Sequence, residues 1–168
     1  EEWAPIGARR FLDLIENSFY DDTRFFRVVD NFVAQWGISG DPTNQCCASI
    51  EDEPVVGSNT RGTISFAAAG PDTRTTQLFI NLVDNTFLDS SDFPPFARVV
   101  AGMDVVDQLY SGYGDQVENK QGKIQREGNV YLETNYPLLS YIISTKHVEE
   151  INSAAQTSVS FSGAVLMR

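Results

Sequence analysis

The chain has 168 residues, of which 42% are hydrophobic, so it is long enough to bury one substantial core and favours a single globular domain. Its 23 acidic and 12 basic side chains give a formal net charge of −11, which disfavours binding to nucleic-acid phosphates and to anionic membrane surfaces. We therefore exclude nucleic-acid binding as the main role.

Cysteine and histidine offer few ligands for a metal ion. Cys46 and Cys47 are neighbours in the chain, and an ordinary disulfide between adjacent residues would be strained, so we expect reduced thiols in a loop. A redox pair or a pair of metal ligands is the alternative interpretation of these two residues. Because His147 is the only histidine, the sequence gives no basis for a zinc site. We predict no metal and no cofactor.

The sequence does not assign a compartment. No apolar run approaches the roughly 20 residues that a membrane-spanning helix needs. The first residues, Glu1, Glu2 and Trp3, do not resemble a signal peptide. Since the chain opens without methionine, we expect that its N-terminus was processed or cut.

The N-terminal part predicts a helix followed by two strands. Between residues 4 and 19 the apolar side chains recur at spacings of three and four, which is typical of an amphipathic helix, and Pro5 stands near its first turn. Residues 24–29 and 32–36 are rich in β-branched and aromatic side chains and are separated by a polar pair, as two strands joined by a bend would be. Residues 37–62 predict a long irregular connection.

The rest of the chain predicts more strands, with helices at the periphery. We expect, in chain order, strands at 62–69, 77–83 and 96–100, a helix at 103–110, a loop at 112–122, a strand candidate at 123–125 and a helix at 135–142 that has Pro137 in its first turn. Several strands with only peripheral helices favour an antiparallel barrel or sandwich. Residues 143–157 resemble a polar linker, whereas residues 158–162 alternate between polar and apolar side chains as a short strand does.

Three sequence blocks carry residues at spacings that are familiar from one enzyme family. In residues 25–35 an arginine, Arg27, is followed five positions later by Phe32 and eight positions later by Gln35. Residues 62–80 form the most distinctive block and include Gln77 and Phe79. The third block consists of residues 87–89 and 96–106. Together these blocks, over about residues 3–143, resemble the cyclophilins, a family of peptidyl-prolyl cis-trans isomerases.

The resemblance implies a mostly β fold, an eight-stranded antiparallel β-barrel capped by helices, with a shallow proline-binding groove on its outer face. It assigns residues 1–143 to the isomerase domain and leaves residues 144–168 as a C-terminal extension, a linker with a short strand. A cyclophilin normally begins with two strands before its first helix, whereas this chain starts at the helix. We therefore expect two strands to be absent, and either the tail or a partner protein could fill the gap.

The resemblance also implies rotation about X–Pro bonds of polypeptides, which aids folding or conformational switching, with proline-containing polypeptides as the binding partners. A peptide bond resists rotation by roughly 20 kcal/mol because resonance gives it double-bond character. As the bond twists, the proline nitrogen regains a lone pair that a fixed donor can stabilise, and Arg27 is the catalytic candidate for that donor. The residues implied to bind the substrate are Phe32, Val33, Gln35, Ala67, Ala68, Gln77, Phe79, Phe87 and Leu88.

Several positions depart from the family pattern. Phe26 stands where most members have histidine, Val33 where they have methionine and Trp36 where they have glycine. Ala68 stands where most have asparagine, and Phe87 where tryptophan is common. No histidine counterpart lies near Phe93. These changes leave the donor and the apolar slot in place but remove polar contacts around them. We therefore expect peptide affinity and sequence preference to differ more than the reaction does.

Other interpretations of the same residues stay open at this point. Arg27 by itself could be a strand arginine in a surface ion pair, and the aromatic residues of the slot could be ordinary core residues. A cyclophilin-like structural or binding subunit of a larger protein assembly, with little or no catalysis, is the alternative function. An unrelated all-β ligand-binding protein is a third possibility, and it requires the three blocks to be coincidental.

Overall fold

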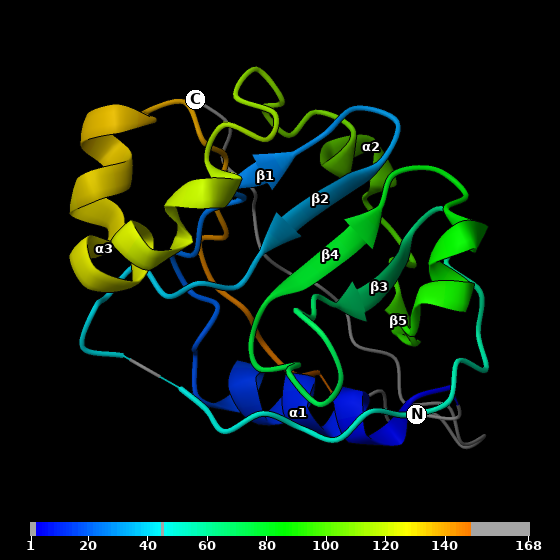
Figure 1. Cartoon of the computed structure of the whole chain (residues 1–168). Coiled ribbons are helices and arrows are strands. Elements are labelled where there is room, and N and C mark those ends of the chain that lie inside the picture. The colour runs from blue at the N-terminus through cyan, green and yellow to red at the C-terminus, as the bar shows by residue number, and fades with distance from the viewer. Residues whose placement is uncertain (1–2, 45, 149–168) are drawn as a thin grey trace.

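The structure, a computed structural model that describes residues 3–44 and 46–148, is built around one antiparallel sheet. Within these residues the sheet has five strands in the spatial order β1-β2-β4-β3-β5, and Figure 1 shows them side by side. The strands are β1 (Arg27–Val28), β2 (Val33–Trp36), β3 (Thr63–Phe66), β4 (Leu78–Asn81) and β5 (Pro95–Arg98). All five lie within segments that the sequence predicts as strands, apart from the first residue of β5.

The strand register separates two faces of the sheet. In β2, Ala34 and Trp36 belong to the main hydrophobic core, whereas Val33 belongs to a separate small cluster together with Phe79. This division follows from the alternation of side chains along a strand. Opposite Gln35 on the neighbouring strand stands Phe79. The second face of the sheet is thus lined by residues that the sequence analysis assigns to the groove.

Helix α1 (Pro5–Glu16) covers the first face of the sheet. The predicted apolar stripe is confirmed, since Phe11 and Ile15 are among its buried residues. The ring of Phe11 packs against that of Phe96 with centroids 5.1 Å apart. Figure 1 shows α1 beneath the sheet, on the side of β3 and β5.

Three short helices and one longer helix complete the described part of the chain. They are η1 (Thr86–Ser91), α2 (Met103–Val106), η2 (Glu118–Lys120) and α3 (Gln121–Asn135). Helix α2 is shorter than the predicted segment 103–110. Between β2 and β3 the described residues form no helix or named strand, only an isolated bridge between Ile50 and Arg74, which agrees with the predicted long connection.

Helix α3 docks on that connection at a sharp kink. Gly128 has φ of +61° inside the helix, and an added Cβ would lie 2.2 Å from the carbonyl oxygen of Gly40. Only glycine allows both the positive φ and this close approach. The next residue, Asn129, donates its backbone N–H to the same carbonyl oxygen at 2.8 Å. The kink therefore holds α3 and the η2 segment before it against the connection after β2.

Two predicted elements are wrong, because the structure gives their residues a different conformation. The strand candidate at 123–125 lies inside α3, where Ile124, Tyr131 and Leu132 are buried at helical spacing. The predicted helix at 135–142 is absent, since α3 ends at Asn135 and Tyr136 before Pro137 leaves the helical region with φ of −139°. Residues 140–142 instead pair with residues 22–25 through backbone hydrogen bonds.

Of the expected eight-stranded barrel the described residues show only a part, and the full barrel stays a prediction. The part of the chain that the structure describes contains an open five-stranded sheet, in which β1 and β5 form the two edges. The residues of the predicted strand at 123–125 are helical. Beside residues 22–25 the strand pairing is limited to one isolated bridge, from Arg24 to Tyr141. The absence of two N-terminal strands stays a prediction. The predicted strand at 158–162 lies outside the described residues.

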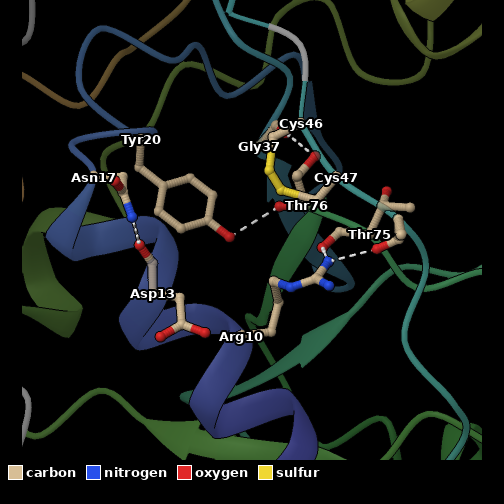
Figure 2. The surroundings of a disulfide bond; sticks show 10 residues. Arg10, Asp13, Asn17, Tyr20, Gly37, Cys46, Cys47, Thr75 and Thr76 are labelled. Atoms are coloured by element: carbon tan, nitrogen blue, oxygen red, sulfur yellow. Dashed lines mark hydrogen bonds between the residues drawn. A yellow bond between two sulfur atoms is a disulfide. The ribbon is translucent and has the colours of Figure 1, made fainter.

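The cysteine pair lies in the connection between β2 and β3. The structure joins Cys46 to Cys47 as a disulfide between adjacent residues, contrary to the expected reduced thiols. Figure 2 shows this pair close to Thr76, whose carbonyl oxygen accepts a hydrogen bond from the hydroxyl of Tyr20 at 3.0 Å. Arg10 of α1 donates hydrogen bonds to the carbonyl oxygens of Ala48 and Thr75. The connection is thereby tied to α1 and to the residues before β4.

Candidate functional site

A groove of about 350 Å³ lies on the second face of the sheet, opposite α1. Of the ten predicted site residues, nine line it: Arg27, Phe32, Val33, Gln35, Ala67, Ala68, Gln77, Phe79 and Leu88. They come from strands β1, β2 and β4 and from residues next to β2, β3 and β4, together with η1. The fold thus brings residues that are up to 61 positions apart in the chain, Arg27 and Leu88, into one site.

An apolar floor occupies one part of the groove. Val33, Phe79 and Leu88 are buried there as a cluster of their own, with exposed fractions of 2%, 6% and 8%. Phe93 closes the floor, since its ring meets that of Phe79 edge to face at 5.7 Å. Such a surface suits an apolar ring such as pyrrolidine, because burying it removes apolar area from water.

Phe87 is the one predicted site residue that does not line the groove. Its side chain is 59% exposed and stacks on Phe32, with the ring centroids 6.1 Å apart. Phe87 therefore extends the aromatic wall outward, toward solvent. It can contact only a peptide that projects beyond the groove.

A row of hydrogen-bonded amides crosses the polar part of the groove. Arg27 Nη1 donates to Gln35 Oε1 at 3.3 Å, and Gln35 Nε2 donates to Gln77 Oε1 at 3.0 Å. Gln77 Nε2 in turn donates to Gln121 Oε1 at 2.9 Å, at the first residue of α3. The pairing of β1 with β2 sets Arg27 opposite Gln35, and this register starts the row. Each amide is thereby fixed in orientation by its neighbour.

The guanidinium of Arg27 is held from three sides. Its Nε donates to Asp115 Oδ1 at 2.6 Å, and Glu118 Oε2 approaches the same nitrogen at 3.7 Å. The Phe32 ring centroid lies 5.5 Å from the guanidinium carbon, within the range of a cation–π contact. Because the Arg27 side chain is only 20% exposed, its position is set by these partners rather than by solvent.

A partly buried polar network anchors η1, which carries Leu88. Asp89 accepts hydrogen bonds from the hydroxyl of Ser58 and from both the backbone and side-chain N–H groups of Asn59. Burial raises the pKa of the Asp89 carboxyl, but these hydrogen bonds act in the opposite direction and leave its pKa below the ordinary value. At the other end of η1, the Asn85 side chain donates to the carbonyl oxygen of Phe32 at 2.9 Å. The network thus joins two walls of the apolar slot.

The described residues offer no alternative chemistry in the form of a metal site or a membrane span. No group of three or more His, Cys, Asp and Glu side chains within residues 3–44 and 46–148 is arranged to hold a metal ion. None of the helices in the same part of the chain has the length and apolar character to cross a bilayer.

Comparison with known proteins agrees with the resemblance in the sequence. The sequence model described as "Cyclophilin type peptidyl-prolyl cis-trans isomerase/CLD" matches residues 1–129, more than half of the chain. The chain belongs to this family. The match includes the whole groove, from Arg27 to Gln121.

Two relatives named as peptidyl-prolyl cis-trans isomerases are similar over much of the chain. A peptidyl-prolyl cis-trans isomerase of Acinetobacter baylyi is 42% identical over 116 residues, which are 63% of this chain and 61% of that protein. Peptidyl-prolyl cis-trans isomerase B of Escherichia coli is 38% identical over 120 residues, 65% of this chain and 73% of that protein. This chain thus spans about six tenths of the length of the Acinetobacter relative.

A solved cyclophilin structure supports the fold. The crystal structure of a cyclophilin type peptidyl-prolyl cis-trans isomerase from Cryptosporidium parvum, in the presence of the dipeptide Ala-Pro, matches with a TM-score of 0.53 at 24% identity. The match covers 61% of this chain and 70% of that chain. It shows that the open sheet and its helices are arranged as in the cyclophilin fold.

Sequence reasoning missed part of the cyclophilin groove. Ala69, Thr73, Thr75, Phe93, Glu118 and Gln121 also line it. Glu118 and Gln121 lie in the segment predicted as a plain loop, outside the three blocks that carry the family resemblance. The only available signal was the acidic character of residues 115–118, which by itself does not indicate a contact with Arg27, 88 positions earlier in the chain.

Proposed function

We propose that this chain is a peptidyl-prolyl cis-trans isomerase that acts on X–Pro bonds of polypeptides, with Arg27 as the catalytic donor. One observation carries the proposal: the guanidinium of Arg27 and the apolar floor of Val33, Phe79 and Leu88 line the same groove of about 350 Å³. A proline residue presents the same two features, an apolar ring joined to an amide nitrogen. The groove can therefore receive the ring while the donor faces the bond.

The mechanism uses the difference between the planar and the twisted amide. In the planar isomers the lone pair of the proline nitrogen is delocalised and accepts hydrogen bonds poorly. In the twisted state the lone pair is localised, so a guanidinium N–H interacts with it more strongly than with either isomer. Arg27 is suited to this role because its charge is permanent and its donors lie in one plane. Only the Arg27 side chain supplies a cation among the groove-lining residues that the structure describes.

The remaining groove residues bind and orient the peptide. Phe32 and Phe79 bound the slot for the pyrrolidine ring, so the proline side of the bond stays fixed while the carbonyl side turns. Gln35 is hydrogen-bonded to the donor and Gln77 to Gln35, and we assign both side-chain amides to binding of the peptide backbone. Ala67 and Ala68 border the groove with small side chains, which leaves the peptide close access to the backbone there.

An assay of the isolated chain tests the proposal directly. We expect the chain to accelerate cis-to-trans exchange of an X–Pro peptide, followed by NMR exchange or by protease-coupled absorbance, whereas the Arg27→Ala variant does not. Uncatalysed exchange takes tens to hundreds of seconds. A chain that folds but does not shorten this time would contradict the proposal. An Arg27→Ala variant as fast as the parent would contradict the assigned role of Arg27.

The alternative, a cyclophilin-like binding subunit with little or no catalysis, gains no support from the comparisons, because the relatives named above are all called isomerases. A protein partner at the N-terminal gap or the C-terminal tail stays a prediction. Size-exclusion chromatography of the chain with extracts of its source, before and after truncation at residue 143, measures whether such a complex exists.

A further inference from the structure

Asp115 belongs to the segment between α2 and η2, which the family blocks do not include. Its carboxylate meets Arg27 from outside the groove: Asp115 is exposed to 58% and does not line the cavity, yet its Oδ1 lies 2.6 Å from Arg27 Nε. Figure 1 shows the η2 segment that follows it beside β1, where Arg27 stands. The contact joins positions that are 88 residues apart, so it depends on the docking of this segment.

The nitrogen that Asp115 binds is the one that fixes the guanidinium plane. Nε is bonded to the side-chain stem, and the two Nη nitrogens extend beyond it in the same rigid plane. A strong acceptor on Nε, together with Gln35 on Nη1, leaves the plane one orientation. Glu118, at 3.7 Å from the same nitrogen, is too distant for a direct hydrogen bond and contributes only through its charge.

Stability of the fold does not account for this contact. An ion pair whose acidic partner is more than half exposed contributes little to folding, on the order of 0–1 kcal/mol. Orientation of a catalytic donor is far more sensitive, because a misplacement of about 1 Å can cost about 100-fold in rate. We therefore expect the contact to act on the orientation of the Arg27 guanidinium rather than on the stability of the fold.

We propose that Asp115 is a positioning residue, which holds the Arg27 guanidinium so that its Nη donors face the groove. The inference rests on the proposed isomerase function. It adds a residue outside the groove to the machinery, and it explains why the segment before α3 is docked against β1. Asp115 touches no substrate in this arrangement and acts only through Arg27.

The test compares Asp115→Ala and Asp115→Asn with the parent chain on one X–Pro peptide. We expect kcat to fall about 10- to 100-fold in Asp115→Ala, with KM within about twofold of the parent. Asp115→Asn keeps an oxygen acceptor but loses the charge, so its kcat should lie between the other two. In parallel, the ¹H–¹⁵Nε NMR signal of Arg27 should move in Asp115→Ala toward the position of solvent-exposed arginines.

A matched control is available on the neighbouring helix. Glu133 of α3, exposed to 64%, pairs with Arg24 at 3.0 Å and does not line the groove. Glu133→Ala removes an ion pair of the same kind and should keep the parental kcat and the parental Arg27 Nε signal.

The outcomes separate this inference from the proposed function. If the parent chain catalyses no exchange, the function fails, and the Arg27 Nε signal alone decides about the positioning contact. An unchanged signal and an unchanged kcat in Asp115→Ala would overturn the inference. It is also overturned if kcat falls only in step with the folded fraction, because Asp115 would then act on stability.

Discussion

Arg27 faces the groove through a planar set of N–H donors rather than through a point charge. Gln35 and Asp115 each bind a different nitrogen of this plane. A lysine at the same position would keep the charge but could not make both contacts, because its ammonium group has neither the reach nor the fixed geometry. The shape of the donor, more than its charge, is therefore what the surrounding residues are arranged to hold.

The first prediction follows from this shape. Arg27→Lys should lower kcat by about 100-fold or more, as removal of one preorganised donor does in other enzymes. Circular dichroism and the melting temperature should stay close to those of the parent, because lysine keeps the positive charge and an ion pair with the exposed Asp115 contributes little to folding. A lysine variant with more than half of the parental kcat would show that charge alone is sufficient.

Phe87 allows a second prediction at the level of single residues. Its ring is 59% exposed and stacks on Phe32, so Phe87→Ala should raise KM for X–Pro peptides by about two- to tenfold and leave kcat unchanged. Val100→Ala is the control, since Val100 is 71% exposed and does not line the groove. Equal KM values for both variants would place Phe87 outside the peptide contacts.

At the scale of elements, the short helix η1 has little stability of its own and is held in place by hydrogen bonds to other segments. Six residues form it, and a helix this short is marginal by itself. Asp89 and Asn85 fix it through hydrogen bonds to Asn59 and to the Phe32 carbonyl oxygen. Leu88 consequently reaches the apolar floor in a defined position.

The third prediction concerns the pH dependence of this anchor. Because the native pKa of Asp89 is depressed, its carboxylate stabilises the fold above the unfolded pKa of about 4 and loses that effect as the pH falls through the native pKa. Asp89→Asn should lower the free energy of unfolding by about 1–3 kcal/mol at pH 7. Urea denaturation should show this difference shrinking below about pH 4. A difference that stays constant down to pH 2 would contradict the assignment.

The N-terminal part of helix α3 was predicted as a strand because only three residues were considered there. Three residues, 123–125, were compatible with a strand, whereas the buried positions of the helix extend from Ile124 to Leu132. The helical periodicity is interrupted at Gly128, where the backbone turns to meet Gly40. An element that bends around a distant carbonyl oxygen does not show a continuous stripe in its sequence.

At the scale of the whole molecule, a buried ion pair joins α1 to the connection after β2 and to the residues before β4. Glu53 accepts hydrogen bonds from the backbone N–H groups of Ile6 and Gly7 in the first turn of α1 and from Arg74 at 3.0 Å. The side chains of Glu53 and Arg74 are 4% and 1% exposed. The carboxylate thus meets both the positive end of the helix and a buried cation.

The fourth prediction tests this junction. Glu53→Gln should lower the free energy of unfolding by about 3–5 kcal/mol, because it leaves Arg74 buried without its main counter-charge. Asp13→Asn is the control, since Asp13 forms an exposed pair with Arg9 and should cost less than about 1 kcal/mol. Urea denaturation measures both. Equal losses in the two variants would show that the buried pair does not anchor α1.

The amino-acid sequence by itself determined the family, helix α1, the five strands and α2, though not the short helix η1, and nine of the residues that line the groove. The helix and strand positions follow from side-chain patterns within single segments, whereas the family and the groove residues are implied by the resemblance of three separate sequence blocks to the cyclophilins. Only the tertiary structure decided that the sheet of the described residues is open, that residues 121–135 are helical and that Asp115 binds Arg27. Those features depend on contacts between distant segments, such as Arg27 and Asp115, which are 88 positions apart, and no spacing within one segment encodes such contacts.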